Sequence, residues 1–252
     1  MLSMTLLGVG TAVPDMDREN THMVWSAPEG LLLVDAGGST YQRLLRASLD
    51  PLTLQGVFLT HSHADHINGL PALLFQLSLA GYADTLPIYG NAPTLELMQR
   101  VLTAFELGSH QVPVEWIPVT SGQVLPLPVS SYRLKVADTV HPRACLALRF
   151  EDPTCGRALV YSADTEPCPT VLDLAKDATI LIHEATTDTP FAGHTTPRQA
   201  GTVAVNAGAE RLVLVHFSPH WTMSASQAIE EVRAAGFAGD AEIGREFGVY
   251  SL

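Results

Sequence analysis

The six residues His61-Ser62-His63-Ala64-Asp65-His66 place three imidazoles and one carboxylate within one short stretch of chain. They directly follow Gly56–Thr60, an apolar run that predicts a short buried strand. His61 and His63 are two positions apart, so in an extended segment their side chains point the same way. A turn after them can direct the side chains of Asp65 and His66 toward a second metal ion. Because these side chains are good ligands for transition metals, the stretch predicts a metal site rather than a solvated polar loop.

Around this stretch, apolar runs of strand length alternate with helix-like segments, which predicts a layered α/β architecture. The chain contains no repeat and no Gly/Ser-rich linker, so residues 1–252 are expected to form a single domain. Further strands are predicted over Met4–Val9, Gly30–Val34, Pro87–Tyr89, Val114–Val119, Tyr132–Val140, Cys145–Phe150, Ala158–Ser162, Thr179–His183 and Leu212–His216. Helices are predicted over Thr40–Ala47 (capped by Ser39), Ile67–Ala80, Thr94–Phe105, Thr170–Ala175, Thr196–Ala207 and Ala225–Ala235.

Other histidines and aspartates stand where predicted strands end, namely His141, Asp164, His183 and His216. Strand ends are rigid, and the loops that leave them can converge on one cleft. Two metal ions need more ligands than the six-residue stretch supplies. His141, Asp164 and His216 are therefore candidates to complete a site with two ions. His183 lies within an apolar run, and His22, His110 and His220 have no motif around them.

Several of these segments resemble a known family. His61–His66 has the H-x-H-x-D-H motif of the metallo-β-lactamase superfamily, and the chain looks most like the branch of ribonuclease Z, the zinc enzyme that trims the 3′ end of transfer-RNA precursors. The resemblance extends over Leu7–Pro14, Leu33–Gly37, Leu59–Pro71, His183–Thr186, Gly193–Thr196 and Val215–Pro219. It implies an αββα sandwich, in which two mixed β-sheets are flanked by helices.

The resemblance also implies a role for each site residue. It implies two divalent ions, most simply Zn²⁺ with Mn²⁺ or Fe²⁺ as alternatives, and a water molecule between them as the nucleophile. Asp65 would orient that water and accept its proton, while His194, supported by Glu184, would assist the leaving oxygen. His183 is not a ligand in this family and is expected to be structural. The implied ligands are His61, His63 and His141 for the first ion, Asp65, His66 and His216 for the second, and Asp164 for both.

The chain departs from ribonuclease Z in one respect that concerns the substrate. That family carries an inserted arm that grips transfer RNA between the residues matching His141 and Asp164, and here the interval holds only two predicted strands and a short turn. The segment Gly37–Thr40 also differs from the family. We therefore expect a phosphodiesterase for a small or unstructured phosphodiester. Transfer-RNA 3′ processing, or hydrolysis of a lactone, thioester or β-lactam, is the alternative.

Composition limits the partners. The 252 residues carry a net charge of −12, from 14 basic and 26 acidic residues, which opposes binding to a long phosphate backbone. The three cysteines, Cys145, Cys155 and Cys168, form no metal or disulfide pattern. No signal peptide or membrane-spanning run is recognisable, so a soluble cytoplasmic protein without a membrane partner is expected. A homodimer is implied by the family resemblance alone.

Overall fold

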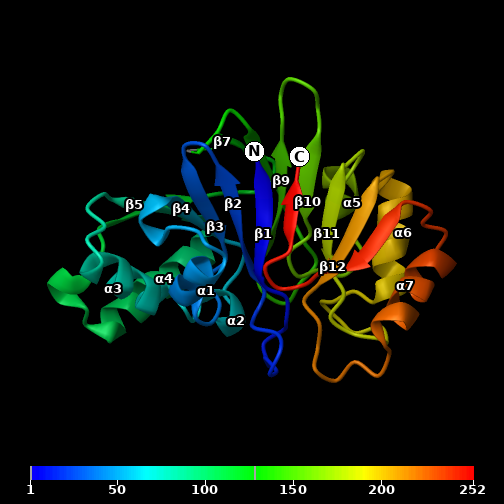
Figure 1. Cartoon of the computed structure of the whole chain (residues 1–252), viewed down its shortest axis with the longest axis horizontal. Helices are drawn as coiled ribbons and strands as arrows, with labels where there is room; N and C mark the ends of the chain where they lie inside the picture. The colour runs from blue at the N-terminus through cyan, green and yellow to red at the C-terminus, as the bar shows by residue number, and fades with distance from the viewer. Residues whose placement is uncertain (1, 128) are drawn as a thin grey trace.

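Two seven-stranded β-sheets make up the centre of the computed structural model, which describes residues 2–127 and 129–252 (Figure 1). The first sheet has the order β14 (Val249–Ser251), β1 (Ser3–Gly8), β2 (His22–Ala27), β3 (Gly30–Val34), β4 (Leu54–Leu59), β5 (Leu86–Gly90) and β6 (Val114–Pro118). The second has the order β13 (Asp240–Ile243), β12 (Arg211–Val215), β11 (Ile180–Glu184), β10 (Ala158–Tyr161), β9 (Leu146–Glu151), β8 (Arg133–Asp138) and β7 (Val124–Pro126).

Both sheets are mixed. In the first sheet, β3 to β6 run parallel and the strands from β14 to β3 are antiparallel. In the second, β10 to β13 run parallel and β7 to β10 are antiparallel. The carboxyl ends of parallel strands meet at one edge of a sheet, and this is where the predicted site residues begin.

Helices cover the outer side of each sheet (Figure 1). The first sheet is covered by α1 (Thr40–Arg46), α3 (Leu70–Leu79) and α4 (Ala92–Phe105), with α2 (Ala64–Ile67) at its edge. The second sheet carries α5 (Pro169–Leu174), α6 (Pro197–Ala207) and α7 (Ala225–Ala234). Two short 3-10 helices, η1 (Pro51–Thr53) and η2 (Gly108–His110), complete the elements. The expected αββα sandwich is confirmed.

The main hydrophobic core lies between the two sheets. Trp25 of β2 stacks on Phe150 of β9 with ring centroids 4.8 Å apart, and the ring of Tyr132 is tilted against the indole at 5.4 Å. Offset aromatic contacts of this kind add to the free energy gained by burying the rings. A second core fills the space between the first sheet and its helices, with Leu44 and Leu74 fully buried in it. The sheets that carry the site are therefore rigidly held.

Four strands, β2, β7, β13 and β14, were not predicted from the sequence. Three of them are only three or four residues long, whereas β2 has six residues with the buried apolar run Met23–Trp25, a strand signal that was missed. The predicted helix Ile67–Ala80 is also wrong in its extent, since the chain forms α2 and then α3. Gly69 lies between the two helices as the N-cap of α3, and only glycine fits there because a Cβ would lie 2.4 Å from the carbonyl oxygen of Gly38. Asp65 and His66 accordingly lie on α2 and not in a simple turn.

Ser39 does not cap α1 through its side chain, which was the expectation. Its hydroxyl and its backbone N–H both donate instead to the carboxylate of Glu19, at 3.0 and 2.6 Å. The helix thus begins where the sequence predicts, but Glu19 holds that end of it from another segment of the chain. No helix among the described residues has both the length and the apolar character needed to cross a membrane.

Candidate metal centre

The ends of β4, β10 and β12 deliver the site residues to one edge of the sandwich. His61 follows β4 after Thr60, Asp164 follows β10, and His216 follows β12 directly. Three residues at these and the neighbouring strand ends have left-handed backbones: Asp35 with φ 60°, Ala163 with φ 48° and His216 with φ 63°. Non-glycine residues rarely adopt such angles, and where they do so together the strain often marks a functional site.

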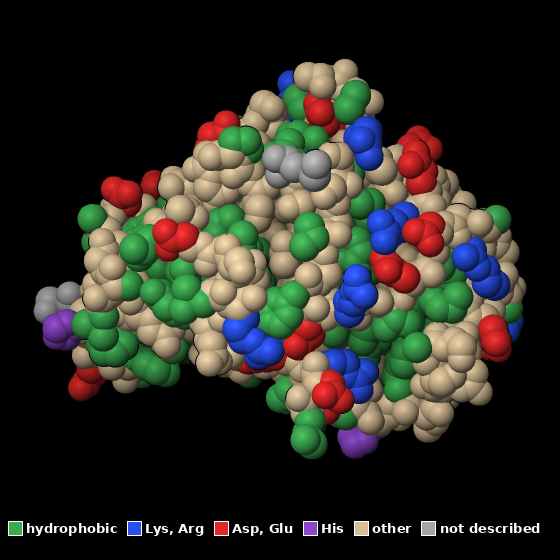
Figure 2. Space-filling model, viewed as in Figure 1, with side chains coloured by type: hydrophobic (Ala, Val, Ile, Leu, Met, Phe, Trp, Pro, Cys, Tyr) green, Lys and Arg blue, Asp and Glu red, His purple; other side chains and the backbone are tan. Residues whose placement is uncertain are grey.

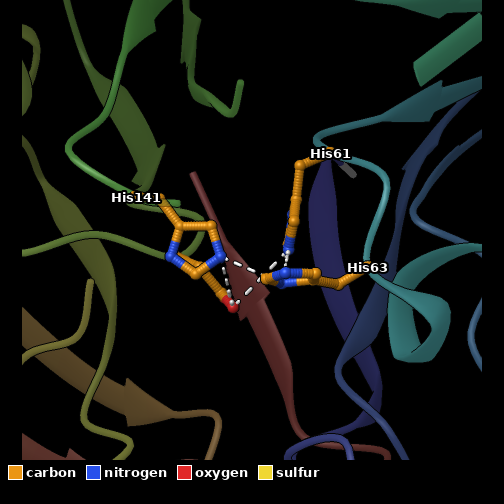
Figure 3. Close-up of side chains that lie close together, drawn as sticks. His61, His63 and His141 are labelled. Atoms are coloured by element: carbon orange, nitrogen blue, oxygen red, sulfur yellow. Dashed lines mark hydrogen bonds and ion pairs between the residues drawn. The ribbon is translucent and has the colours of Figure 1, made fainter. Parts of the chain in front are cut away.

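The first group of side chains consists of His61, His63, His141 and Asp164. Figure 3 shows the three imidazoles pointing toward one another; His61 and His63 come from one loop and His141 from a separate part of the chain. Nδ1 of His63 lies 3.1 Å from Nε2 of His61 and 3.0 Å from Nε2 of His141. Oδ2 of Asp164 lies 3.7 Å from Nε2 of His61 and 3.9 Å from Nε2 of His141. Four donor atoms therefore surround a single point.

The second group consists of Asp65, His66 and His216. Oδ2 of Asp65 lies 3.4 Å from Nε2 of His66 and 3.5 Å from Nε2 of His216. Asp164 also faces this group, with Oδ2 3.6 Å from His66 and Oδ1 3.5 Å from His216. Asp164 thus faces both groups.

Hydrogen bonds behind the rings determine which nitrogen each ring presents. The Thr60 hydroxyl donates to the Asp35 carboxylate at 2.9 Å and therefore accepts from Nδ1 of His61 at 3.1 Å. Nδ1 of His66 donates to the same Asp35 carboxylate at 2.8 Å. Since Nδ1 is the donor in both hydrogen bonds, Nε2 is the ring nitrogen that faces the centre. Partners of this kind fix ligand orientation in metal proteins.

Two further rings, those of His216 and His141, are held in the same way. Thr186 donates its hydroxyl to Glu184 at 2.6 Å, so its oxygen accepts from Nδ1 of His216 at 2.7 Å. Nδ1 of His141 donates to the carbonyl oxygen of Gly193 at 2.8 Å. Both rings therefore also turn Nε2 toward the centre.

The charges in the centre are strongly coupled. Burial disfavours a charge on His61, and together with the nearby His66 it holds the pKa of His61 well below its usual range. Burial opposes a charge on His66 as well, but the carboxylates of Asp164, Asp35 and Asp65 hold the pKa of His66 well above its usual range. A positive charge is thus stabilised between the carboxylates. A metal cation satisfies the same electrostatic demand.

Several donor atoms in the centre fit a divalent ion because they have nothing else to bind. Nε2 of His66, Nε2 of His216 and Oδ1 of Asp164 are buried, and none has a hydrogen-bond partner within the described part of the chain. Leaving such atoms unpaired costs about 1–3 kcal/mol each, so a partner is expected. Imidazole nitrogens with carboxylate oxygens are a donor set that suits zinc. The centre is therefore a candidate site for divalent metal.

Beside the metal centre, His194 and Glu184 form a pair. Nδ1 of His194 lies 3.0 Å from Oε1 of Glu184, whose carboxylate is fully buried and also accepts from the backbone of Thr165 at 2.8 Å. Burial lowers the pKa of His194, but the carboxylates of Glu184, Asp164 and Asp65 together raise it above the usual value. His194 also belongs to a group with Asp164 and His216 that could hold an ion. Both a catalytic role and a ligand role are therefore compatible with its position.

A cleft of about 410 Å³ opens directly over these residues. It is large enough for a small ligand, and an entrance for water and substrate is what a catalytic metal centre requires. Its lining includes Thr11, His63, Asp65, Thr187, His194 and Ser218.

The remaining histidines lie apart from the two groups. His183 is buried within β11, where its Nδ1 donates to the carbonyl oxygen of Glu184 at 2.8 Å. His22 is buried at the start of β2, and His110 and His220 are exposed. Sequence reasoning missed Asp35, which orients both Thr60 and His66. The sequence feature that could have identified Asp35 is its place directly after the apolar strand Gly30–Val34.

The sequence model of the family described as "Beta-lactamase superfamily domain" matches residues 31–217. Ribonuclease BN of Cronobacter sakazakii is 29% identical over 90% of this chain and 93% of its own. The metallo-β-lactamase fold protein YhfI of Bacillus subtilis has 25% identity and a TM-score of 0.85, over 99% of this chain and 98% of its own. The short form of human tRNase Z has 25% identity and a TM-score of 0.75 over the same shares.

The family match covers most of the chain and contains all of the first group and all of the second. The alignment with ribonuclease BN spans 289 positions, more than the 252 residues of this chain, so that relative carries inserted segments that are missing here. The chain belongs to the metallo-β-lactamase superfamily and is a ribonuclease Z-like, metal-dependent hydrolase within it.

Proposed function

We propose that this protein is a phosphodiesterase with two zinc ions, acting on a small or short, unstructured phosphodiester. The observation that carries the proposal is the position of Asp164. Its Oδ2 lies 3.7 Å from Nε2 of His61 in the first group, and its Oδ1 lies 3.5 Å from the unpartnered Nε2 of His216 in the second. We assign His61, His63 and His141 to one ion, Asp65, His66 and His216 to the other, and Asp164 to both. Two such cations, when bound, lower the pKa of a water molecule and neutralise charge on the phosphoryl oxygens.

The chain's own residues supply the proton transfers. Asp65 lines the cleft beside both groups, where it orients the attacking water and accepts its proton. His194 lines the same cleft and its pKa is raised by nearby carboxylates, Glu184 foremost, which suits it to donate a proton to the oxygen that leaves phosphorus. Glu184 itself is a positioning residue, since Thr165 and Thr186 fix its carboxylate. A general acid of this kind contributes about 10²–10⁴-fold to the rate.

The proposed size of the substrate rests on what surrounds the cleft. Between His141 and Asp164 the chain holds only β9, β10 and their connections, where ribonuclease Z carries its arm. On the face shown in Figure 2, Lys and Arg side chains are interspersed with Asp and Glu and, among the residues coloured by type there, form no continuous basic surface. The net charge of −12 adds a general repulsion toward nucleic acid.

Ribonuclease action is the second candidate, and the likeness to ribonuclease BN over 90% of the chain favours it. The test compares zinc-loaded protein on bis(p-nitrophenyl) phosphate, on short linear diesters and on a 3′-extended transfer-RNA precursor. We expect efficient cleavage of the small diesters and weak action on the precursor. Cleavage of the precursor at one site, at rates well above those on small diesters, would overturn the proposed size of the substrate. Hydrolysis of a lactone or β-lactam without any diester cleavage would overturn the proposed bond.

A further inference from the structure

Three aromatic rings form a row that leads from the metal centre to the surface. The ring of His194 lies 5.8 Å from that of His216 with an angle of 19° between the planes, and 6.2 Å from that of Phe191 with an angle of 24°. Side-chain exposure rises along this row, from 3% for His216 to 17% for His194, and Phe191 is 63% exposed as a residue. Phe191 therefore presents an open ring beside the proposed general acid.

The loop that carries Phe191 is tied down at both ends. The Asp188 carboxylate accepts from the backbone N–H of Thr222 at 2.9 Å. Gly193 donates its N–H to Glu166 at 2.8 Å, and its carbonyl accepts from the ring of His141. His194 N–H also donates to the carbonyl of Phe191 at 3.1 Å, which closes a turn. An exposed ring on such an anchored turn is held in place for a ligand at little further entropic cost.

Isolated exposed apolar side chains are normal on protein surfaces, so exposure alone would mean little. Phe105 at the end of α4 shows the contrast: it is 53% exposed, and no aromatic partner for it is found among the described residues. Phe191 differs because its ring is nearly parallel to a ring that lines the cleft. A planar group of the substrate can continue this row, since offset stacking is the favoured arrangement of aromatic rings.

We propose that Phe191 is a specificity-determining residue that stacks on a planar aromatic group, an aryl ring or a nucleobase, of the phosphodiester in the cleft. This inference rests on the proposed phosphodiesterase function and narrows its substrate class. Substrates with a planar group next to the phosphate are bound in preference to those with a small alkyl group. The ring of Phe191 is uncharged, so this preference among substrates depends on the planar shape of the group next to the phosphate and not on its charge.

The test measures binding, so it does not depend on turnover. Calorimetry on the zinc-loaded protein compares phenyl phosphate with methyl phosphate, and adenosine 5′-monophosphate with ribose 5-phosphate. The first pair reports an aryl group and the second a nucleobase. We expect the planar member of at least one pair to bind about tenfold more tightly, as the loss of one aromatic stack typically gives. Phe191→Ala should abolish the preference, Phe191→Trp should retain it, and Phe105→Ala is the matched control that leaves it unchanged.

Zinc content measured on each variant shows that the metal centre is intact. A preference that persists in Phe191→Ala, or its absence from the unmodified protein in both pairs, contradicts the inference. A preference that is lost only in Phe191→Ala supports it, even if the protein cleaves no diester. In that case the phosphodiesterase proposal fails while the stacking site stands.

Discussion

The Asp35 carboxylate lies 2.8 Å from Nδ1 of His66, and both side chains are completely buried. The same carboxylate accepts from the hydroxyl of Thr60, which in turn holds His61. One aspartate thus orients a histidine in each of the two groups. Asp35 contacts these side chains from behind and belongs to neither group of proposed ligands, so we regard it as a positioning residue.

Asp35→Asn should therefore weaken zinc binding without removing a ligand. The loss of a partner behind a metal-bound histidine typically costs 10–100-fold in affinity. Competition with a chelator of known affinity measures the effect, and Asp84→Asn, an exposed aspartate, is the control. Equal zinc affinity in Asp35→Asn and in the unmodified protein would show that Asp35 does not position the centre.

Asp164→Ala should lower the metal content far more than His183→Ala. Asp164 faces both groups, whereas His183 is held inside β11 by the carbonyl oxygen of Glu184. Metal analysis of both purified variants measures this, with circular dichroism to show that each is folded. Unchanged metal content in a folded Asp164→Ala protein would mean that the ligand assignment is wrong.

His194→Ala should lower turnover by about 10²–10⁴-fold while zinc content stays the same. The reason is that His194 is proposed to donate a proton and not to bind an ion. Rates on bis(p-nitrophenyl) phosphate and metal analysis on the same sample separate the two roles, and the exposed His220→Ala is the control. Because His194 also groups with Asp164 and His216, loss of one ion in this variant would make it a ligand.

The local pattern of the sequence predicted a layered α/β fold and candidate ligands at strand ends, whereas the αββα sandwich and the full set of proposed ligands were implied by the family resemblance. A buried apolar strand followed by His61, Asp164 or His216 is visible as a local pattern, and each of these strand ends lies at the centre. Asp35 was missed because its partners Thr60 and His66 are distant in sequence, and no local pattern pairs them. The strand β13, Asp240–Ile243, was missed because pairing with β12 and not its own apolar content makes it a strand.

A pH effect on stability follows from His22, which is outside both groups. Burial lowers its pKa to about 4, from an ordinary value of 6.5. Between these two values the unfolded chain binds a proton that the folded chain excludes, so stability falls as the pH drops below 6.5. The loss at pH 5 is about 2 kcal/mol relative to pH 7.5.

His22→Gln should therefore show a smaller difference in unfolding free energy between these two pH values. Glutamine keeps a donor that can reach the carbonyl of Asn20, which now accepts from Nδ1 of His22 at 2.8 Å. Urea unfolding of the metal-free proteins measures the difference without interference from metal release. An identical pH dependence in both proteins would mean that His22 is not excluded from protonation in the folded state.

The number of ions bound tests the account most directly. Metal-free protein is titrated with zinc in the presence of a chromophoric chelator, and bound metal is counted per chain by elemental analysis. The account predicts two equivalents for the unmodified protein, because Asp164 stands between two groups of donor atoms. It also predicts that His63→Ala weakens the binding of one ion far more than that of the other. A folded protein that takes up no zinc, or a single equivalent, would contradict it.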